Sequence, residues 1–311
     1  MGHILSLLGE HSPSKVVFTA DDVPDMTGKV VLVTGGNTGI GKDTARVLLT
    51  KNAKVWIACR DVIKGEATVK DLEECTSRQA HLLKLDLANL QSIKTSAEEF
   101  TSKETQLHVL FNNAGIMAPP IEQLTADGYD LQFGTNVLGH FYLTKLLLPT
   151  LLSAAESSPD GIARVVDSSS SGHWFGELDF GTIKDSSKRR TRNRAELYGQ
   201  SKTGNIIFSA ELHRRYRDQG IVSISLNPGG IRTEILRHQA SFVQWILELT
   251  MYPVSYGAFT QLYAATSPEA VDLGGQYLIP WARVGRPRTD TQDPQLGKML
   301  WTYMEEQVAN L

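Results

Sequence analysis

Tyr198 and Lys202 are the two residues whose types and spacing point most directly to chemistry, because a phenol and an ammonium stand four positions apart. The apolar pattern predicts a helix over 195–217, and side chains four residues apart share one face of a helix. A nearby cation favours an ionised phenol, so we expect Lys202 to lower the pKa of Tyr198 from its ordinary value of about 10. Such a phenol can donate or accept a proton at a hydroxyl or carbonyl oxygen. The same spacing also arises by chance on helix surfaces, so its meaning depends on the rest of the chain.

A glycine-rich turn supplies a second chemical signal. It follows an apolar run at 30–34 and opens a helix predicted over 41–51. Its glycines allow a tight turn, let backbone N–H groups approach a pyrophosphate and permit close packing of the helix on the strand. The sequence therefore predicts a dinucleotide site here, with contacts from Gly35, Asn37, Thr38, Gly39, Ile40 and Gly41.

The end of the next predicted strand, at 55–58, indicates which dinucleotide is bound. A carboxylate there would bind the ribose 2′-hydroxyl of NAD and repel the 2′-phosphate of NADP. The chain instead has Arg60, whose planar cation suits a phosphate, and we expect the adjacent Asp61 to cap the following helix. These residues predict NADP(H) as the cofactor.

Short β-branched runs alternate with longer helical stretches from residue 29 onward, which is typical of a parallel sheet covered by helices on both faces. The predicted strands cover 30–34, 55–58, 81–85, 109–112, 164–168, 222–226 and 276–279. The predicted helices cover 41–51, 62–76, 90–102, 129–153 and 195–217. We therefore expect one doubly wound α/β domain with a seven-stranded parallel sheet.

The expected organisation is an N-terminal extension at 1–26, the α/β domain at 27–280 and a C-terminal helical tail at 281–311. The apolar segment at 241–256 favours a substrate lid, with a core helix and a membrane-surface helix as the alternatives. The basic run at 186–194 favours a solvated loop, although such runs also serve nuclear import or phosphate binding.

Composition narrows the partners and the compartment. A net charge of −3 and a pI near 6.3 give no basic field, so we expect small-molecule partners and no nucleic acid. Cys59 and Cys75 indicate free thiols in a reducing, cytoplasmic setting, and no histidine spacing suggests a metal site. The N-terminus lacks the features of a signal peptide. Its Met-Gly-x-x-x-Ser start loosely matches N-myristoylation, which leaves membrane association open beside simple packing on the domain.

Taken together, the glycine spacing, the Tyr198/Lys202 pair and Asn112-Asn113-Ala114-Gly115 resemble the short-chain dehydrogenase/reductase family over about residues 27–277. The resemblance implies a Rossmann-type fold with a C-terminal helical lid or extension. Segments such as 57–61 and 133–141 are similar to the retinol dehydrogenase-like branch. The opening at 22–29 and the tail after residue 280 are similar to fungal members of that branch.

By this resemblance the catalytic residues are Asn136, Ser170, Tyr198 and Lys202. Ser170 would bind the substrate oxygen, although the run of serines leaves Ser169 open as the alternative. Tyr198 would exchange the proton, Lys202 would hold the nicotinamide ribose, and Asn136 would hold a water that links Lys202 to solvent. The remaining cofactor contacts would be Asp86, Leu87, Asn113, Ala114, Gly115, Tyr198, Lys202, Pro228, Ile231 and Thr233. A plain helix cap remains the alternative role of Asp86.

The activity that the resemblance implies is hydride transfer between a nicotinamide and the alcohol or carbonyl group of a lipophilic molecule, in fungal secondary metabolism. A non-catalytic NADP(H)-binding scaffold is the alternative, but a scaffold is free to lose the four catalytic residues that this chain keeps. The chain departs from the family where Asp167-Ser168 replaces the usual Asn-Val, and in the long gap between Ser170 and Tyr198. Many relatives pair through the helices that precede and contain the catalytic Tyr, which leaves a homo-oligomer open.

Overall fold

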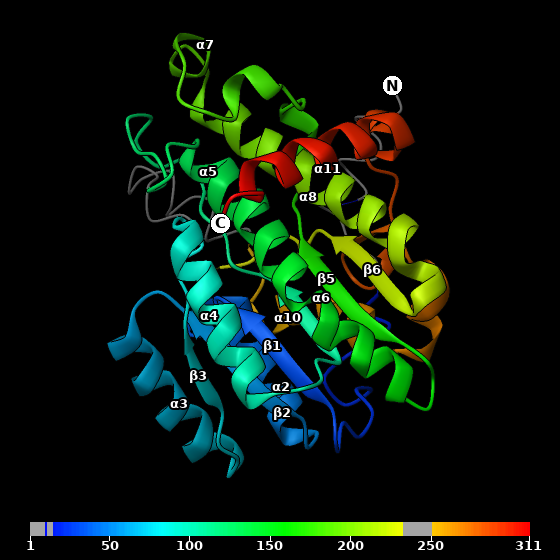
Figure 1. Cartoon of the computed structure of the whole chain (residues 1–311). Coiled ribbons are helices and arrows are strands. Elements are labelled where there is room, and N and C mark those ends of the chain that lie inside the picture. Colours follow the sequence, from blue (N-terminus) through cyan, green and yellow to red (C-terminus); the bar gives the residue numbers. More distant parts are fainter. Residues whose placement is uncertain (1–9, 11–14, 233–250) are drawn as a thin grey trace.

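The apolar runs of the chain pair into one sheet in the order β3-β2-β1-β4-β5-β6-β7-β8 (Figure 1). The computed structural model describes Glu10 and residues 15–232 and 251–311. Its strands are β1 Val30–Thr34, β2 Lys54–Cys59, β3 His81–Lys84, β4 Val109–Asn112, β5 Ala163–Ser168, β6 Ile221–Leu226, β7 Tyr277–Ile279 and β8 Arg283–Val284. The first seven are parallel, so the predicted doubly wound sheet is confirmed.

The eighth strand was not predicted. β8 is two residues long and runs antiparallel to β7, with Leu278 opposite Val284 and Ile279 opposite Arg283. A two-residue strand is too short to show an alternation of apolar and polar side chains. It lies in the segment expected as a helical tail, and the helix of that tail follows it.

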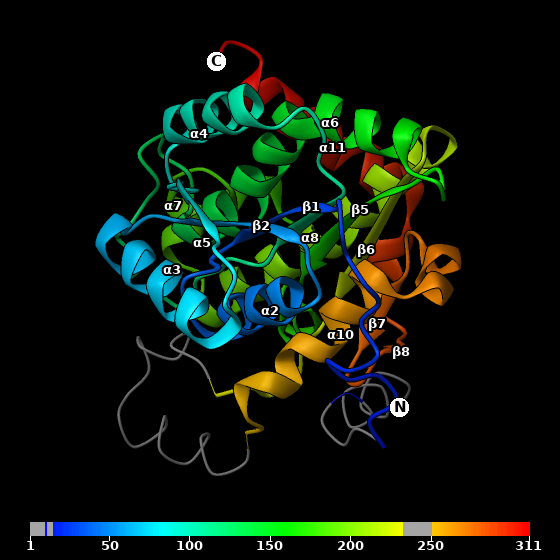
Figure 2. The same cartoon turned by 90° about the horizontal axis from the view of Figure 1, so that it is seen from below.

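Helices cover both faces of the sheet, and Figure 2 shows α4 and α6 on one side with α2 and α10 on the other. The α-helices are α2 Gly39–Thr50, α3 Val62–Thr76, α4 Leu90–Lys103, α5 Leu131–Phe133, α6 Gly139–Ser157, α7 Ser187–Arg190, α8 Arg194–Tyr216, α10 Val254–Thr266 and α11 Pro294–Val308. Several begin at capping side chains, among them Asp61 for α3, Asn89 for α4 and Asp293 for α11. Every residue of β5 and β6 is buried, as expected for parallel strands that are covered on both faces.

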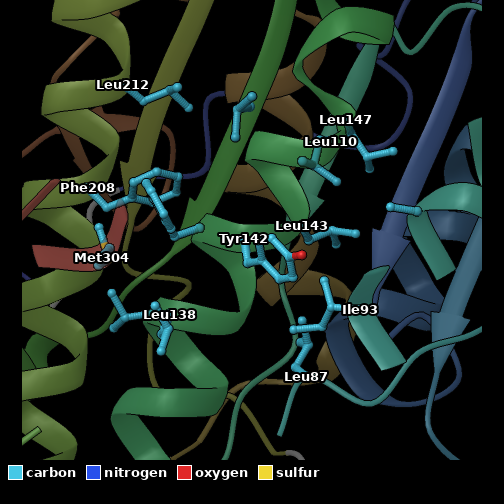
Figure 3. Close-up of a cluster of buried hydrophobic side chains, with 14 of the residues drawn as sticks. Leu87, Ile93, Leu110, Leu138, Tyr142, Leu143, Leu147, Phe208, Leu212 and Met304 are labelled. Carbon is cyan, nitrogen blue, oxygen red and sulfur yellow. The ribbon is translucent and has the colours of Figure 1, made fainter. Parts of the chain in front are cut away.

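The sheet separates two hydrophobic cores. Side chains from α4, α6, α8 and α11 meet on one face, in a cluster that includes Ile93, Leu143, Phe208 and Met304 (Figure 3). Residues of α2, α3 and α10 fill the other face, together with Phe18 from the segment before β1. The larger core therefore joins the C-terminal helix to the helix that contains the Tyr198/Lys202 pair.

The C-terminal helix α11 is anchored by Trp301. The indole meets Phe141 of α6 edge to face at 5.1 Å and stacks near Phe208 of α8 at 6.2 Å. The guanidinium of Arg215 lies 4.5 Å from the indole centroid. α11 thus packs across both α6 and α8.

The helix predicted over 129–153 is divided into α5, a π-helical turn at Gly134–Leu138 and α6. Close packing accompanies the division, because a Cβ on Gly134 would lie 2.3 Å from Cγ2 of Thr125 and a Cβ on Gly139 would lie 2.5 Å from the carbonyl oxygen of Leu87. This stretch is long and apolar enough to cross a membrane by composition alone, with a mean hydropathy of 1.3. Because 67% of its most apolar window is buried within the protein, we assign it to the core of the domain.

The basic run at 186–194 differs from the predicted solvated loop. Arg189 is 1% exposed and its Nη1 lies 3.3 Å from the Asp130 carboxylate. The exposed Arg190 and Arg192 pair with acidic side chains that precede them in the chain. The expectation is therefore wrong for Arg189, which joins this loop to the start of α5. Most of the expected lid, residues 241–250, lies outside the described residues.

Candidate active site

The carboxyl ends of the strands on one half of the sheet surround a cavity of about 500 Å³. This is where parallel α/β sheets bind ligands, because the strand order reverses between β1 and β4. The predicted dinucleotide contacts that line the cavity are Gly35, Asn37, Thr38, Gly39, Ile40, Gly41, Arg60, Asp86, Leu87, Asn113, Ala114 and Gly115. The structure thus brings together residues that lie as much as 80 positions apart along the chain.

The glycine-rich turn needs its glycines for two separate reasons. Gly35 and Gly39 have φ angles of 66° and 52°, in the left-handed region that glycine adopts without strain. Gly41 has a different constraint, since a Cβ there would lie 2.5 Å from Nδ2 of Asn113 and from the carbonyl oxygen of Gly35. Asn113 in turn donates this amide to the carbonyl oxygen of Thr34 at 2.8 Å. The turn is therefore an open cradle of backbone that fits a pyrophosphate.

Two cations line the cavity where β2 ends. Asp61 caps α3 as predicted, with its Oδ1 accepting from the backbone N–H of Lys64 at 3.1 Å. Arg60 and Lys64 both line the cavity, and within the described part of the chain neither side chain has an ion-pair partner. Lys64 was missed at the sequence level, although its position four residues after Arg60 in the first turn of a helix is a signal that could have identified it.

Asp86 does not cap the next helix. The cap of α4 is Asn89, whose Oδ1 accepts from the backbone N–H of Ser92 at 3.0 Å. Asp86 accepts instead from the N–H of Ala88 at 3.0 Å and stands at the cavity wall beside Leu87. The cap alternative is therefore wrong, and the side chain lies where an adenine contact is expected.

A second group of predicted residues meets where β5 ends and α8 begins. The phenol of Tyr198 hydrogen-bonds the hydroxyl of Ser170, which also accepts from the N–H of Gly172 at 3.1 Å. Ser169 turns away and donates its hydroxyl to the backbone carbonyl of Lys202 at 2.8 Å. The arrangement places Ser170, and not Ser169, beside the phenol.

The expected lowering of the Tyr198 pKa by Lys202 is wrong for this structure. Burial raises the pKa of Tyr198 to about 12, and the hydrogen bond from Ser170 opposes this shift. Lys202 is too far away to outweigh burial, because its Nζ lies 5.7 Å from the phenol ring centroid and donates to the carbonyl oxygen of Ser168 at 2.8 Å. Burial also lowers the pKa of Lys202 to about 8, against the opposing effect of Asp167.

Asn136 lies in the π-helical turn and is fully buried. Its side-chain amide pairs with the backbone of Ile116, accepting at 2.9 Å and donating at 3.0 Å, and it donates to Ser201 of α8. Its backbone carbonyl accepts from Nδ2 of Asn205 at 2.9 Å and contacts Nδ1 of His140 at 3.0 Å. The side chain therefore joins α8 to the segment that follows β4, while its water-holding role stays a prediction.

Asp167 is a buried acid that sequence reasoning noted only as a departure from the family. Its Oδ1 accepts from Asn112 at 2.9 Å and its Oδ2 from Ser223 at 3.3 Å. Burial nevertheless raises the pKa of Asp167 to about 7. It directly precedes Ser168, whose carbonyl oxygen accepts from Lys202, and its charge raises the pKa of Lys202 against the effect of burial.

The turn after β6 carries the remaining predicted contacts. Pro228 is followed by Gly229, whose N–H donates to the side chain of Asn227 at 3.0 Å. Ile231 is buried and pairs with Tyr252. Pro228 and Ile231 are not among the residues that line the cavity, and Thr233 lies outside the described residues.

Comparisons with known proteins agree with this geometry. The family model for short chain dehydrogenase matches residues 29–172. A short-chain dehydrogenase/reductase of Armillaria gallica is 52% identical over 307 residues, which cover 99% of this chain and 99% of that protein. Retinol dehydrogenase 11 of Homo sapiens is 38% identical over 280 residues, covering 89% of this chain and 84% of that protein. The crystal structure of an uncharacterized protein from Mycobacterium paratuberculosis has a TM-score of 0.73 at 32% identity and covers 94% of this chain and 97% of that chain.

The similarity to relatives of this kind extends along nearly the whole chain, well beyond the glycine-rich turn. It includes the segment that contains Tyr198 and Lys202. The chain belongs to the short-chain dehydrogenase/reductase family, as a retinol dehydrogenase-like member of the fungal type.

Proposed function

We propose that this oxidoreductase uses NADP(H) and acts on the alcohol or carbonyl group of a lipophilic small molecule. One observation carries the choice of cofactor. Arg60 and Lys64 line the dinucleotide cavity together, and Asp61, the acid next to Arg60 in the sequence, caps α3. Two cations favour a 2′-phosphate, and the capping bond occupies Oδ1 of Asp61, which leaves Oδ2 as its oxygen for a ribose hydroxyl.

The residues present fit the dinucleotide along its length. The glycine cradle suits the pyrophosphate, the start of α2 adds the favourable end of a helix dipole, and the wall at Asp86 and Leu87 suits the adenine. When bound, the nicotinamide supplies or accepts the hydride. The turn at Pro228 and Gly229 would hold that end of the cofactor against the catalytic residues.

The catalytic group manages the proton at the substrate oxygen. With a pKa raised to about 12, Tyr198 keeps its proton at neutral pH and can give it to an oxygen that becomes an alkoxide. Ser170 already hydrogen-bonds this phenol and would share the same substrate oxygen. This protonation state suits the reduction of a carbonyl, and oxidation of an alcohol would require the phenol to lose its proton first.

An aromatic cluster supports a lipophilic substrate. The ring of Tyr252 meets Trp281 edge to face at 5.0 Å, and Tyr256 meets the same indole at 5.3 Å. The cluster borders the nicotinamide-side turn, because a Cβ on Gly229 would lie 3.7 Å from the Trp281 ring. Aromatic rings beside a reaction site favour apolar ligands with few polar groups. A role in fungal secondary metabolism remains a proposal that rests on resemblance.

The decisive experiment compares NADPH and NADH binding in wild type, Arg60→Ala and Lys70→Ala, read by energy transfer from tryptophan to nicotinamide. Lys70 is the matched control because it is an exposed cation on α3 that does not line the cavity. We expect Arg60→Ala to weaken NADPH about tenfold or more and to leave NADH unchanged, as the loss of one charge-assisted contact predicts. Equal NADPH and NADH affinities in wild type would overturn the assignment. A panel of aliphatic, aromatic and isoprenoid carbonyls with the preferred cofactor then tests the substrate class.

A further inference from the structure

Glu10 places a carboxylate deep inside the protein. The residue is 1% exposed, although it belongs to the segment that precedes the α/β domain. Burial of a carboxylate is costly unless hydrogen-bond donors replace water. Three donors do so here: Nδ2 of Asn227 at 2.8 Å, Nε1 of Trp174 at 3.1 Å and the hydroxyl of Tyr277 at 3.1 Å.

These donors come from separate segments around the catalytic group. Trp174 lies in the 3-10 turn Ser171–Phe175, directly after Ser170. Asn227 opens the turn after β6, where its Oδ1 accepts the N–H of Gly229. Tyr277 begins β7. One carboxylate therefore joins the turn beside the substrate oxygen to the turn beside the nicotinamide.

The sheet by itself leaves the spacing of these two turns open. The ladder between β5 and β6 ends at the pair Ser168 and Leu226, with one more backbone bond from the N–H of Ser169 to Leu226 at 2.7 Å. Beyond that point no backbone hydrogen bond joins the two turns within the described residues. Glu10 joins the two turns through its side chain. Its partner Trp174 is next to His173, and Nδ1 of His173 lies 2.7 Å from the backbone carbonyl oxygen of Ser170. The contact of Glu10 with this turn is therefore linked to the position of Ser170.

We propose that Glu10 is a positioning residue for catalysis, which fixes the Ser170 turn against the Asn227–Gly229 turn. Glu10 would then contribute to the geometry of the active site although it precedes the α/β domain in the sequence. The inference deepens the function proposed above, since it assigns the two turns to substrate and nicotinamide. It does not depend on which of the two dinucleotides is bound.

The direct test is hydrogen–deuterium exchange on the cofactor-free protein. We compare wild type, Glu10→Ala, Glu10→Gln and the control Asp22→Ala, which changes an exposed acid before β1 whose carboxylate accepts from Thr19. Glu10→Ala should speed exchange about tenfold at the Gly229 amide and in the Ser171–Phe175 turn, because opening becomes easier where a buried bridge is lost. The glycine-rich turn should not change. Glu10→Gln, which keeps one acceptor oxygen, should fall between wild type and alanine.

Ligand binding separates positioning from general destabilisation. Two probes are used: NADPH, and 2′-phospho-ADP-ribose, which lacks the nicotinamide. In Glu10→Ala the Kd of NADPH should rise about fivefold while that of the fragment stays within about twofold, and kcat should fall at least about tenfold through misplacement of the reacting groups. If wild type prefers NADH, the same ratio is measured with NADH and ADP-ribose, so a wrong cofactor assignment does not decide the outcome for Glu10.

Equal weakening of both probes, or unchanged exchange in the two turns, would overturn the proposal and reduce Glu10 to a structural anchor. If Glu10→Ala does not fold, Tyr277→Phe removes one of the three donors and keeps the ring. The same changes in exchange and in the ratio of Kd values should then appear with smaller size. Their absence in that variant would also overturn the proposal.

Discussion

Replacing Asp167 by asparagine should stabilise the protein in a way that depends on pH. Asp167 is fully buried behind Lys202, and burial raises its pKa from 3.8 to about 7. The change keeps the shape of the side chain and restores the residue type usual at this position in the family. The side-chain oxygen of the new asparagine can still accept from Asn112. Its NH2 group can donate to the hydroxyl of Ser223, and that hydroxyl can then donate to Ser209, which lies 2.8 Å away.

The size of the effect follows from the shift in pKa. A raised pKa in an acid means that the folded state resists ionisation, so stability is highest below the unfolded pKa and falls as pH rises toward the folded value. Each unit corresponds to 1.36 kcal/mol, and the shift of Asp167 therefore costs about 4 kcal/mol once the pH exceeds both values. At pH 4.5 the same relation gives a cost of only about 1 kcal/mol. Asp167→Asn removes this cost.

The assay is urea denaturation of wild type and Asp167→Asn at pH 4.5 and pH 8.5, with Asp218→Asn as the control. Asp218 is an acid whose side chain is 89% exposed, so its change should leave both free energies of unfolding unaltered. The gain in Asp167→Asn should be about 3 kcal/mol larger at the higher pH. A gain that is equal at the two pH values, or a loss at pH 8.5, would refute the claim that burial raises the pKa of Asp167.

Three further changes test other parts of the structure. Tyr198→Phe should lower kcat by about 100-fold or more, because a proton donor is lost, while the Kd of the cofactor in a fluorescence titration changes by less than about twofold; retained turnover would dismiss the phenol as the acid. Gly199→Ala should lower the unfolding free energy by about 1–3 kcal/mol in a urea titration, since its Cβ would lie 2.6 Å from the backbone N of Gly176. An unchanged free energy of unfolding would mean that the backbone at Gly176 can move away from Gly199 at little cost. Arg189→Ala should destabilise by about 3–5 kcal/mol because the buried Asp130 carboxylate loses its ion-pair partner, and thermal unfolding unchanged from wild type would argue against the buried pair.

Most of the sheet and half of the site could be predicted from the sequence because their signals are local. A β-branched run followed by glycines and a helix, as at 30–41, encodes a strand, a turn and an anion site within a dozen residues. The strand that ends at Arg60 and the spacing of Tyr198 and Lys202 are equally local. Family resemblance then placed Asn136 in the same group.

The remaining features depend on contacts between distant segments. The sequence predicts Arg189 in solvent because the residues next to it give no sign of an acidic partner. That partner, Asp130, lies 59 positions earlier in the chain and contacts the buried guanidinium. The role of Glu10 required three partners, of which the nearest in sequence is 164 residues distant. The pKa of Tyr198 was misjudged for the same reason, since spacing on a helix reports proximity to Lys202 but not the depth of burial.

The position of α11 has a consequence for how copies of this chain can meet. Many relatives pair through the helices that precede and contain the catalytic Tyr, which here are α6 and α8. In this chain Trp301 of α11 already rests on Phe141 and Phe208 of those two helices. The C-terminal helix therefore covers apolar rings of α6 and α8. We propose that another copy of the chain could pair through these rings only by displacing α11, so that self-association at this face would compete with the chain's own C-terminal helix.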